Sequence, residues 1–180
     1  MSLNILRWMT NILLLVVLSF STFIYASPVV KNTIQSIDLK PFSANSLAQI
    51  TENRAGQAFI MVLWSIDCPP CLKELEHFQA VKAQLTKTNI VLVSTDNPDD
   101  SASIQQVLID NQLQTIDNWI FSDSLPERLR YKIDPNWYGE LPRAYFYEAD
   151  HQRKAHSGML TQAQLQQWLQ KHTSLVSLNQ

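Results

Sequence analysis

Beyond the amino-terminal segment, two apolar stretches of strand length stand out: residues 58–64, and residues 90–94, in which four apolar residues end at Ser94. Runs of this kind are typical of central strands that are buried on both faces of a sheet. Apolar residues then recur at helical spacing from Cys71 onward, which predicts a helix directly behind the first strand. The polar positions of that helix, which we expect to be the more exposed, include Lys73, Glu74 and Glu76.

Helix starts are predicted at three places by the capping-box pattern, in which a Ser or Thr is followed by a Gln at the third position after it. The pattern occurs at Ser46–Gln49, Ser103–Gln106 and Thr161–Gln164. The last of these helices is expected to bury one apolar face, formed by Leu165, Trp168 and Leu169.

The remaining elements are shorter. A strand at 119–121 precedes a brief helix that has Pro126 in its first turn, and residues 143–147 and 153–156 predict a hairpin. Strands that alternate with helices imply a sheet that contains parallel strands and is covered on both faces. We therefore predict an α/β fold with a central mixed sheet flanked by helices.

The amino-terminal residues have the order of a secretory signal: Arg7, the apolar run 12–18, and small residues up to Ala26, after which we expect cleavage. The alternative is an uncleaved membrane anchor. A spanning helix needs about 20 predominantly apolar residues, and here Asn11 and the hydroxyl residues after the run interrupt that length. In either case the rest of the chain works outside the cytoplasm.

Beyond the signal at 1–26, we expect an N-terminal extension at 27–45, one domain at 46–174 and a short tail at 175–180. The extension includes either irregular chain or an edge strand. Lys and Arg total 14 against 16 Asp and Glu, and no basic run is present, so nucleic acid is not expected as the main partner.

The chemistry lies in the only two cysteines, Cys68 and Cys71, which are separated by Pro69 and Pro70 where the strand gives way to the helix. A helix N-terminus favours a thiolate, the attacking species in disulfide exchange. A residue before proline prefers extended geometry, so Cys68 suits the N-cap, and the Cys71 N–H is the nearest backbone donor for its sulfur. The sequence therefore predicts a redox-active dithiol.

Two other interpretations of the cysteines are less well supported. A stabilising bridge across so short a loop would contribute about 2 kcal/mol at most, because little chain entropy is removed. A zinc or copper site would need further ligands, and His77 lies six residues after Cys71, which is not a same-face spacing on a helix.

Trp64 followed by Cys68-Pro69-Pro70-Cys71, together with Gly139-Glu140-Leu141-Pro142 ahead of the hairpin, resembles the TlpA-like thiol–disulfide reductases of the bacterial cell envelope. These proteins have a thioredoxin fold and include those serving cytochrome c maturation. Val93–Asp96 and the helix after it resemble the inserted strand–helix segment of that family. The resemblance covers roughly 35–172 and implies a periplasmic location.

The resemblance also implies roles for individual residues. Cys68 would be the nucleophile, Cys71 the resolving thiol and Pro142 a cis-proline packed against the dithiol, although a trans proline that opens an edge strand is the alternative. The Leu141 backbone would pair with an extended substrate segment. The remaining residues expected at the substrate surface are Trp64, Asp67, Pro69 and Pro70.

The same resemblance implies disulfide-containing envelope proteins as substrates and a membrane thiol transporter of the DsbD type as electron donor. No glutathione or nicotinamide site is evident, so we expect no cofactor. We also expect the protein to be a monomer. The sequence departs from the family at Asp67, where a Trp is common. It departs from thioredoxins at Val62, which replaces a buried acid and leaves Glu74 or another carboxylate to assist proton transfer.

These observations predict a reductase of protein disulfides. A thiol oxidase that donates its disulfide uses the same residues, and the direction depends on the reduction potential. A copper-handling assembly factor and an interaction module with an inert bridge are the rivals from other classes.

Overall fold

The computed structural model describes residues 37–85 and 89–177, with side chains described up to residue 172. The predicted signal peptide at 1–26 and most of the predicted extension lie outside these residues. Six strands of the described chain form one sheet in the order β1-β4-β3-β2-β5-β6. Their bounds are Lys40–Phe42 for β1, Phe59–Trp64 for β2, Asn89–Ser94 for β3, Asp117–Phe121 for β4, Arg143–Tyr147 for β5 and Arg153–Ser157 for β6.

The sheet is mixed, as predicted. Strands β1, β4, β3 and β2 run parallel to one another, whereas β5 is antiparallel to both β2 and β6. The short β1, which falls in the predicted extension, is an edge strand, with Phe42 opposite Phe121 of β4. The central β2 pairs with β3 on one side and with β5 on the other, so that Leu63 lies opposite Val93 and Arg143.

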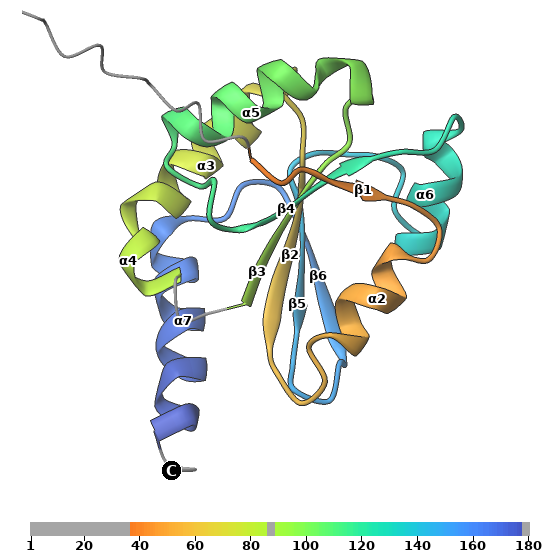
Figure 1. The fold of residues 1–180 in the computed structure, drawn as a ribbon. Helices are drawn as coiled ribbons and strands as arrows, with labels where there is room; N and C mark the ends of the chain where they lie inside the picture. Colours follow the sequence, from red (N-terminus) through yellow and green to blue (C-terminus); the bar gives the residue numbers. More distant parts are fainter. Residues whose placement is uncertain (1–36, 86–88, 178–180) are drawn as a thin grey trace, which may run out of the picture. The chain divides into compact units, whose positions relative to one another are not determined.

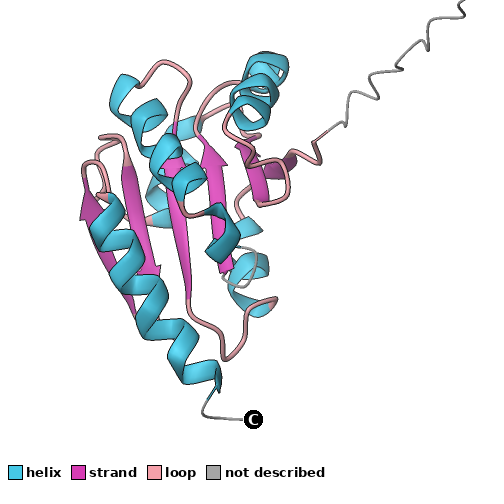
Figure 2. Ribbon diagram, turned by 90° about the vertical axis from the view of Figure 1, so that its left-hand side faces the viewer, coloured by secondary structure: helices cyan, strands magenta, loops and turns pink. Residues whose placement is uncertain are grey.

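Helices cover both faces of this sheet. Helices α3 and α7 lie on one side of the strands, and α2 and α6 lie on the other (Figure 1). The bounds are Ser46–Glu52 for α2, Pro69–Ala80 for α3, Lys82–Leu85 for α4, Ser101–Asp110 for α5, Pro126–Ile133 for α6 and Gln162–Ser177 for α7. A single 3₁₀ turn, Pro98–Asp100, precedes α5. The long α7 runs alongside the strands (Figure 2).

The continuous apolar run of β2 is explained by two cores, one on each face of the sheet. Because side chains alternate along a strand, Ile60, Val62 and Trp64 enter one cluster and Phe59, Met61 and Leu63 enter the other. All six side chains are buried. The first cluster packs against α3, α5 and α7, and the second packs against α2 and α6. Burial on both faces leaves no polar position in this strand.

One predicted capping box is confirmed and two are wrong. In α7, Thr161 Oγ1 accepts from the Gln164 N–H at 3.2 Å, and Gln164 Oε1 accepts from the Thr161 N–H at 2.9 Å. The N-cap of α2 is Asn45 rather than Ser46, whose hydroxyl accepts from the Ser43 N–H instead.

Helix α5 starts two residues before the predicted Ser103. The reason is the 3₁₀ turn in front of it, in which the Asn97 side chain accepts from the Asp99 N–H at 3.0 Å. That turn leads directly into α5, so the chain is already helical when it reaches Ser103. In the described part of the chain, no helix has the length and apolar character needed to cross a membrane.

Candidate active site

The two cysteines lie where β2 ends and α3 begins. Cys68 is the N-cap residue of α3 with extended geometry, and its Sγ accepts from the Cys71 N–H at 3.2 Å, as the sequence predicts. Pro69 and Pro70 occupy the first two helical positions, where missing N–H groups cost nothing, and both are exposed. Cys68 and Cys71 form a disulfide with an S–S distance of 2.01 Å.

The two sulfur-bearing residues differ in accessibility. Cys71 is fully buried in the first core cluster, at 0% exposure, whereas Cys68 is partly exposed. A disulfide of another protein can therefore reach Cys68 but not Cys71. Because disulfide exchange requires direct contact between sulfurs, the two cysteines of this pair are not equivalent toward a partner.

The loop that carries Cys68 is held by Asp96, a residue that the sequence analysis did not single out for this role. Its carboxylate accepts from Ser65 Oγ at 2.6 Å, from the Ile66 N–H at 3.1 Å and from Ser94 Oγ at 2.6 Å. Strands β2 and β3 are parallel, so their carboxyl ends meet at one edge of the sheet. An Asp just after the second strand was the available signal for this contact.

The Leu141–Pro142 loop lies at the same edge. The Leu141–Pro142 peptide bond is cis, and Pro142 is buried. Strand β5 starts directly after this bond and runs antiparallel to β2, with Arg143 opposite Leu63. The start of β5 therefore lies beside the end of β2, and Leu141 and Cys68 both pack against the first core cluster.

A network of ion pairs and hydrogen bonds around Arg143 holds the Leu141–Pro142 loop. Arg143 forms ion pairs with Asp134 at 3.1 Å and with Glu140 at 3.0 Å, and it also hydrogen-bonds Ser157. The Tyr145 hydroxyl donates to Asp134 at 3.0 Å. Burial acts to raise the pKa of Asp134, but hydrogen bonds from the Asn136 N–H, Tyr145 and Arg143 lower it below its usual 3.8. Asp134 is therefore charged and anchors the network.

Glu74 is not exposed as predicted but fully buried, at 0% exposure, on the inner face of α3. One carboxyl oxygen accepts from the Leu160 N–H at 2.6 Å, and the other has no hydrogen-bond partner among the described residues. Burial raises the pKa of Glu74 from 4.5 to about 7, although the Leu160 hydrogen bond acts to lower it. Glu74 follows Cys71 by one helical turn, so both residues lie on the buried face of α3.

The other predicted site residues lie in different settings. Asp67 is exposed. Trp64 is only 1% exposed and belongs to the first core cluster, so its side chain is not at the surface where we expected substrate contact. His77 is partly buried and hydrogen-bonds the Leu160 carbonyl oxygen at 2.9 Å. Within the described ranges, no group of three His, Cys, Asp or Glu side chains is placed to hold a metal ion.

Comparison with known proteins gives matches at the level of structure. No protein-family model matches the sequence, and no curated protein matches it. A secreted disulfide oxidoreductase from Mycobacterium tuberculosis, homologous to E. coli DsbE, is 19% identical with a TM-score of 0.55, covering 67% of this chain and 85% of that one. StoA from Bacillus subtilis is 25% identical with a TM-score of 0.50, covering 63% of this chain and 83% of that one.

A thiol:disulfide interchange protein of the thioredoxin family from Chlorobium tepidum is 15% identical, with a TM-score of 0.55, and the match covers 67% of this chain and 83% of that one. The structural similarity extends over about two thirds of this chain in each case. The chain has the thioredoxin fold, and the solved structures that it resembles are thiol:disulfide oxidoreductases.

Proposed function

We propose that this protein is a periplasmic thiol–disulfide oxidoreductase that reduces disulfides in other proteins. The observation that carries the proposal is the pairing of a partly exposed N-cap sulfur with a fully buried one across a single helical turn. A pair that served only as a stabilising bridge would need no such asymmetry. The fold supports the general reaction, because the structural neighbours include a disulfide oxidoreductase and a thiol:disulfide interchange protein.

The reaction starts from the reduced protein. The Cys68 thiolate, stabilised by the α3 N-terminus and the Cys71 N–H, attacks one sulfur of the partner's disulfide. That disulfide breaks, a mixed disulfide with Cys68 forms, and the partner's first thiolate leaves and is protonated. Cys71 then attacks Cys68 Sγ, which releases the partner's second thiolate as the Cys68–Cys71 bond forms. Two electrons pass to the partner; one of the protons on its cysteines comes from Cys71, and the other comes from solvent, which had taken up the Cys68 proton.

Glu74 is the group that we expect to accept the Cys71 proton before the closing step. A buried thiol attacks slowly unless a base removes its proton, and Val62 offers none. Glu74 lies one turn away on the buried face, has an unpartnered oxygen and has a pKa raised to about 7 by burial. A carboxyl group with this pKa can take up and release a proton near neutral pH.

We expect the substrate contacts and the electron donor that the family resemblance implies. An extended substrate segment would pair with the Leu141 backbone and contact Pro142, Pro69 and Pro70, with Asp67 at the rim. A membrane protein of the DsbD type would return the electrons. The similarity to a secreted protein that is homologous to E. coli DsbE supports this placement in the cell envelope. We expect the protein to act as a monomer.

A trapping experiment tests the reaction. A Cys71→Ser variant, reduced and then mixed with periplasmic extract, should form covalent adducts through Cys68 that disappear when excess dithiothreitol is added. The matched control is Cys68→Ser, which keeps only the buried thiol and should trap nothing. The absence of adducts in Cys71→Ser would count against thiol–disulfide exchange with proteins.

The reduction potential of the Cys68–Cys71 couple, measured by equilibration with glutathione, sets the direction. A value well below that of glutathione supports the reductase, and each interval of about 30 mV corresponds to a tenfold change in the equilibrium constant. A value near the oxidising extreme would make the protein a thiol oxidase with the same two cysteines.

A further inference from the structure

Strand β6 is the outermost strand on its side of the sheet, and it pairs only with β5 among the described residues. The Glu148 N–H donates to the Gln152 carbonyl, and the Gly158 N–H donates to the Pro142 carbonyl, both at 2.9 Å. Hydrogen-bonded and non-bonded pairs alternate along an antiparallel ladder. The backbone groups of residues 154 and 156 therefore bond to β5, and those of residues 153, 155 and 157 point away from the sheet.

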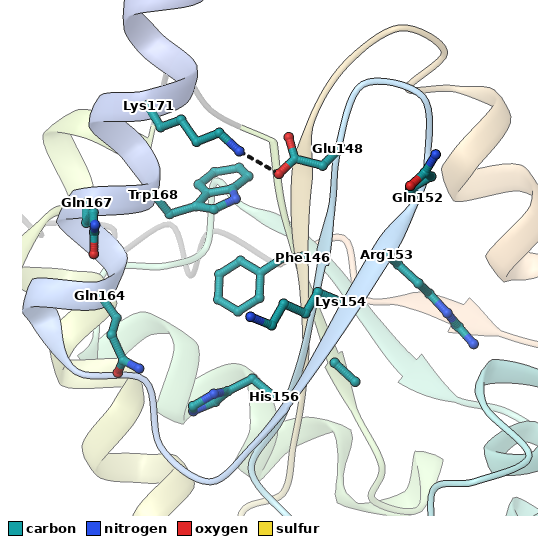
Figure 3. A pocket seen from close by; sticks show the side chains of 11 residues that line it. Phe146, Glu148, Gln152, Arg153, Lys154, His156, Gln164, Gln167, Trp168 and Lys171 are labelled. Carbon is teal, nitrogen blue, oxygen red and sulfur yellow. Dashed lines mark hydrogen bonds and ion pairs between the residues drawn. The ribbon is translucent and has the colours of Figure 1, made fainter.

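A groove of about 620 Å³ lies between β6 and α7 (Figure 3). Phe146 and Trp168 form its apolar part, with ring centroids 6.3 Å apart. Lys154 and His156 project from β6 toward α7 in the same view. They lie on this face because they are opposite Phe146 and Ala144, which belong to the core on the α7 side. The groove therefore lies next to the outer edge of β6, on the face of the sheet that α7 covers.

The groove is cationic although the whole chain has a formal net charge of −2. The charged side chains that face it are two cationic ones, Lys154 and Lys171, and one acidic one, Glu148. The Arg153 guanidinium turns to the other face of the sheet, where it donates to the Ile133 carbonyl oxygen at 2.6 Å. Glu148 is already paired with Lys171 at 2.7 Å. Lys154 is exposed, and no ion pair engages it in the described part of the chain. An acidic ligand would meet an unneutralised positive charge here.

We propose that the β6 edge and this groove bind an extended acidic segment of a partner protein, which adds to the sheet as a further strand. The outward backbone groups of residues 153, 155 and 157 would hydrogen-bond the segment. Its alternate side chains would lie beside Lys154 and His156, where acidic residues are favoured as cross-strand neighbours. The docking site shares neither cysteine nor Pro142 with the dithiol site, and the variants that test it lie at Lys154 and Ala155, so the two sites can be tested separately.

Lysine on an edge strand can also serve only to prevent pairing with other chains. The two roles predict different results. If Lys154 only prevents pairing, β6 binds no added strand; if β6 is a docking site, it binds an acidic strand. Binding of a second copy of this chain would appear as a concentration-dependent dimer in sedimentation.

The test uses the full chain and a fluorescein-labelled peptide of alternating glutamate and valine, followed by fluorescence anisotropy at low salt. Lys154→Glu should weaken binding by at least about fivefold, because an attractive cross-strand pair becomes repulsive. Ala155→Pro should weaken it by a similar factor, because proline removes an outward N–H but leaves the bonds to β5 intact.

Matched variants separate docking from general effects. Ala155→Val keeps the N–H, and Lys132→Glu makes the same charge change on α6, so both should bind within about twofold of the unchanged protein. Bound peptide should slow amide exchange at Ala155 and leave exchange at Lys154 unchanged. Equal binding of a lysine–valine peptide, unchanged binding by Ala155→Pro, no binding at all, or dimer formation without peptide binding would each overturn the proposal.

Discussion

At the scale of single residues, Glu74 shows how burial changes a chemical role. Glu74 is a polar residue on α3, and the helical spacing of apolar residues predicted that it would lie on the exposed face. The structure buries it because the Leu160 N–H, 86 residues further along the chain, provides a hydrogen-bond donor inside the core. No local pattern contains that partner. The sequence therefore predicted only that Glu74 or another carboxylate would assist proton transfer, and not which one.

Burial of Glu74 should make stability depend on pH. The folded protein keeps this proton up to about pH 7, whereas the unfolded chain loses it near its ordinary pKa of 4.5. The free energy of unfolding should therefore fall as pH rises from about 4.5 to about 7, by about 3 kcal/mol. Glu74→Gln removes this dependence and should stabilise the oxidised protein at about pH 8 but not at about pH 4.

Urea denaturation across this pH range measures the effect. Glu76→Gln is the matched control, because Glu76 lies on the same helix, is exposed and pairs only with Lys73. It should leave the pH profile of the unfolding free energy unchanged. Identical pH profiles for Glu74→Gln and the unchanged protein would contradict a raised pKa for Glu74.

Asp96 makes a second prediction at this scale. Asp96→Ala leaves the Ser65 and Ser94 hydroxyls and the Ile66 N–H without their acceptor, which should lower the free energy of unfolding by about 2–4 kcal/mol. Because these contacts hold the loop before Cys68, the rate of attack on a model disulfide should fall too. Asp99→Ala, an exposed position in the neighbouring turn, should change neither quantity.

At the scale of elements, the central strands β2 and β3 were predicted well because strands buried on both faces consist almost entirely of apolar residues. The residues of β5 were predicted from end to end, and β6 differs by one residue. Helix starts were predicted less well, because a capping pattern works only if no earlier residue has already started the helix. Asn97 does so ahead of α5, and no such residue precedes Thr161.

The used and unused capping boxes provide a direct comparison. Thr161→Ala should lower the free energy of unfolding by about 1 kcal/mol, because the Gln164 N–H loses its acceptor. Ser103→Ala changes an exposed residue that already lies inside α5, so its effect should be within about 0.5 kcal/mol. Thermal or urea denaturation of both variants gives the comparison, and equal losses would show that the two positions are not distinguished by capping.

At the scale of the whole molecule, the sheet brings distant segments to one edge. Cys68 follows β2, Asp96 follows β3, and Pro142 precedes β5, which is antiparallel to β2. The sequence predicts the cysteines from local chemistry. It predicts the proline loop only through resemblance, because nothing in the local sequence shows that Pro142 lies at the same edge of the sheet as the cysteines. Sheet order supplies that information.

The two cores on opposite faces of β2 should act independently. Ile104→Val in the first cluster and Ile133→Val in the second should each lower the free energy of unfolding by about 0.5–1.5 kcal/mol. Because the side chains are separated by the sheet, the double variant should show the sum of the two losses to within about 0.5 kcal/mol. A larger coupling, measured by urea denaturation, would show that the faces are packed as one unit.

The burial of Cys71 has a consequence for oxidative damage. Peroxide converts an exposed thiolate to sulfenic acid, and further oxidation to sulfinic acid is irreversible for most proteins. In this protein the oxidant reaches Cys68 but not the fully buried Cys71. Cys71 can then condense with the sulfenic acid, releasing water and restoring the Cys68–Cys71 disulfide. The buried thiol thereby protects the exposed cysteine from permanent loss.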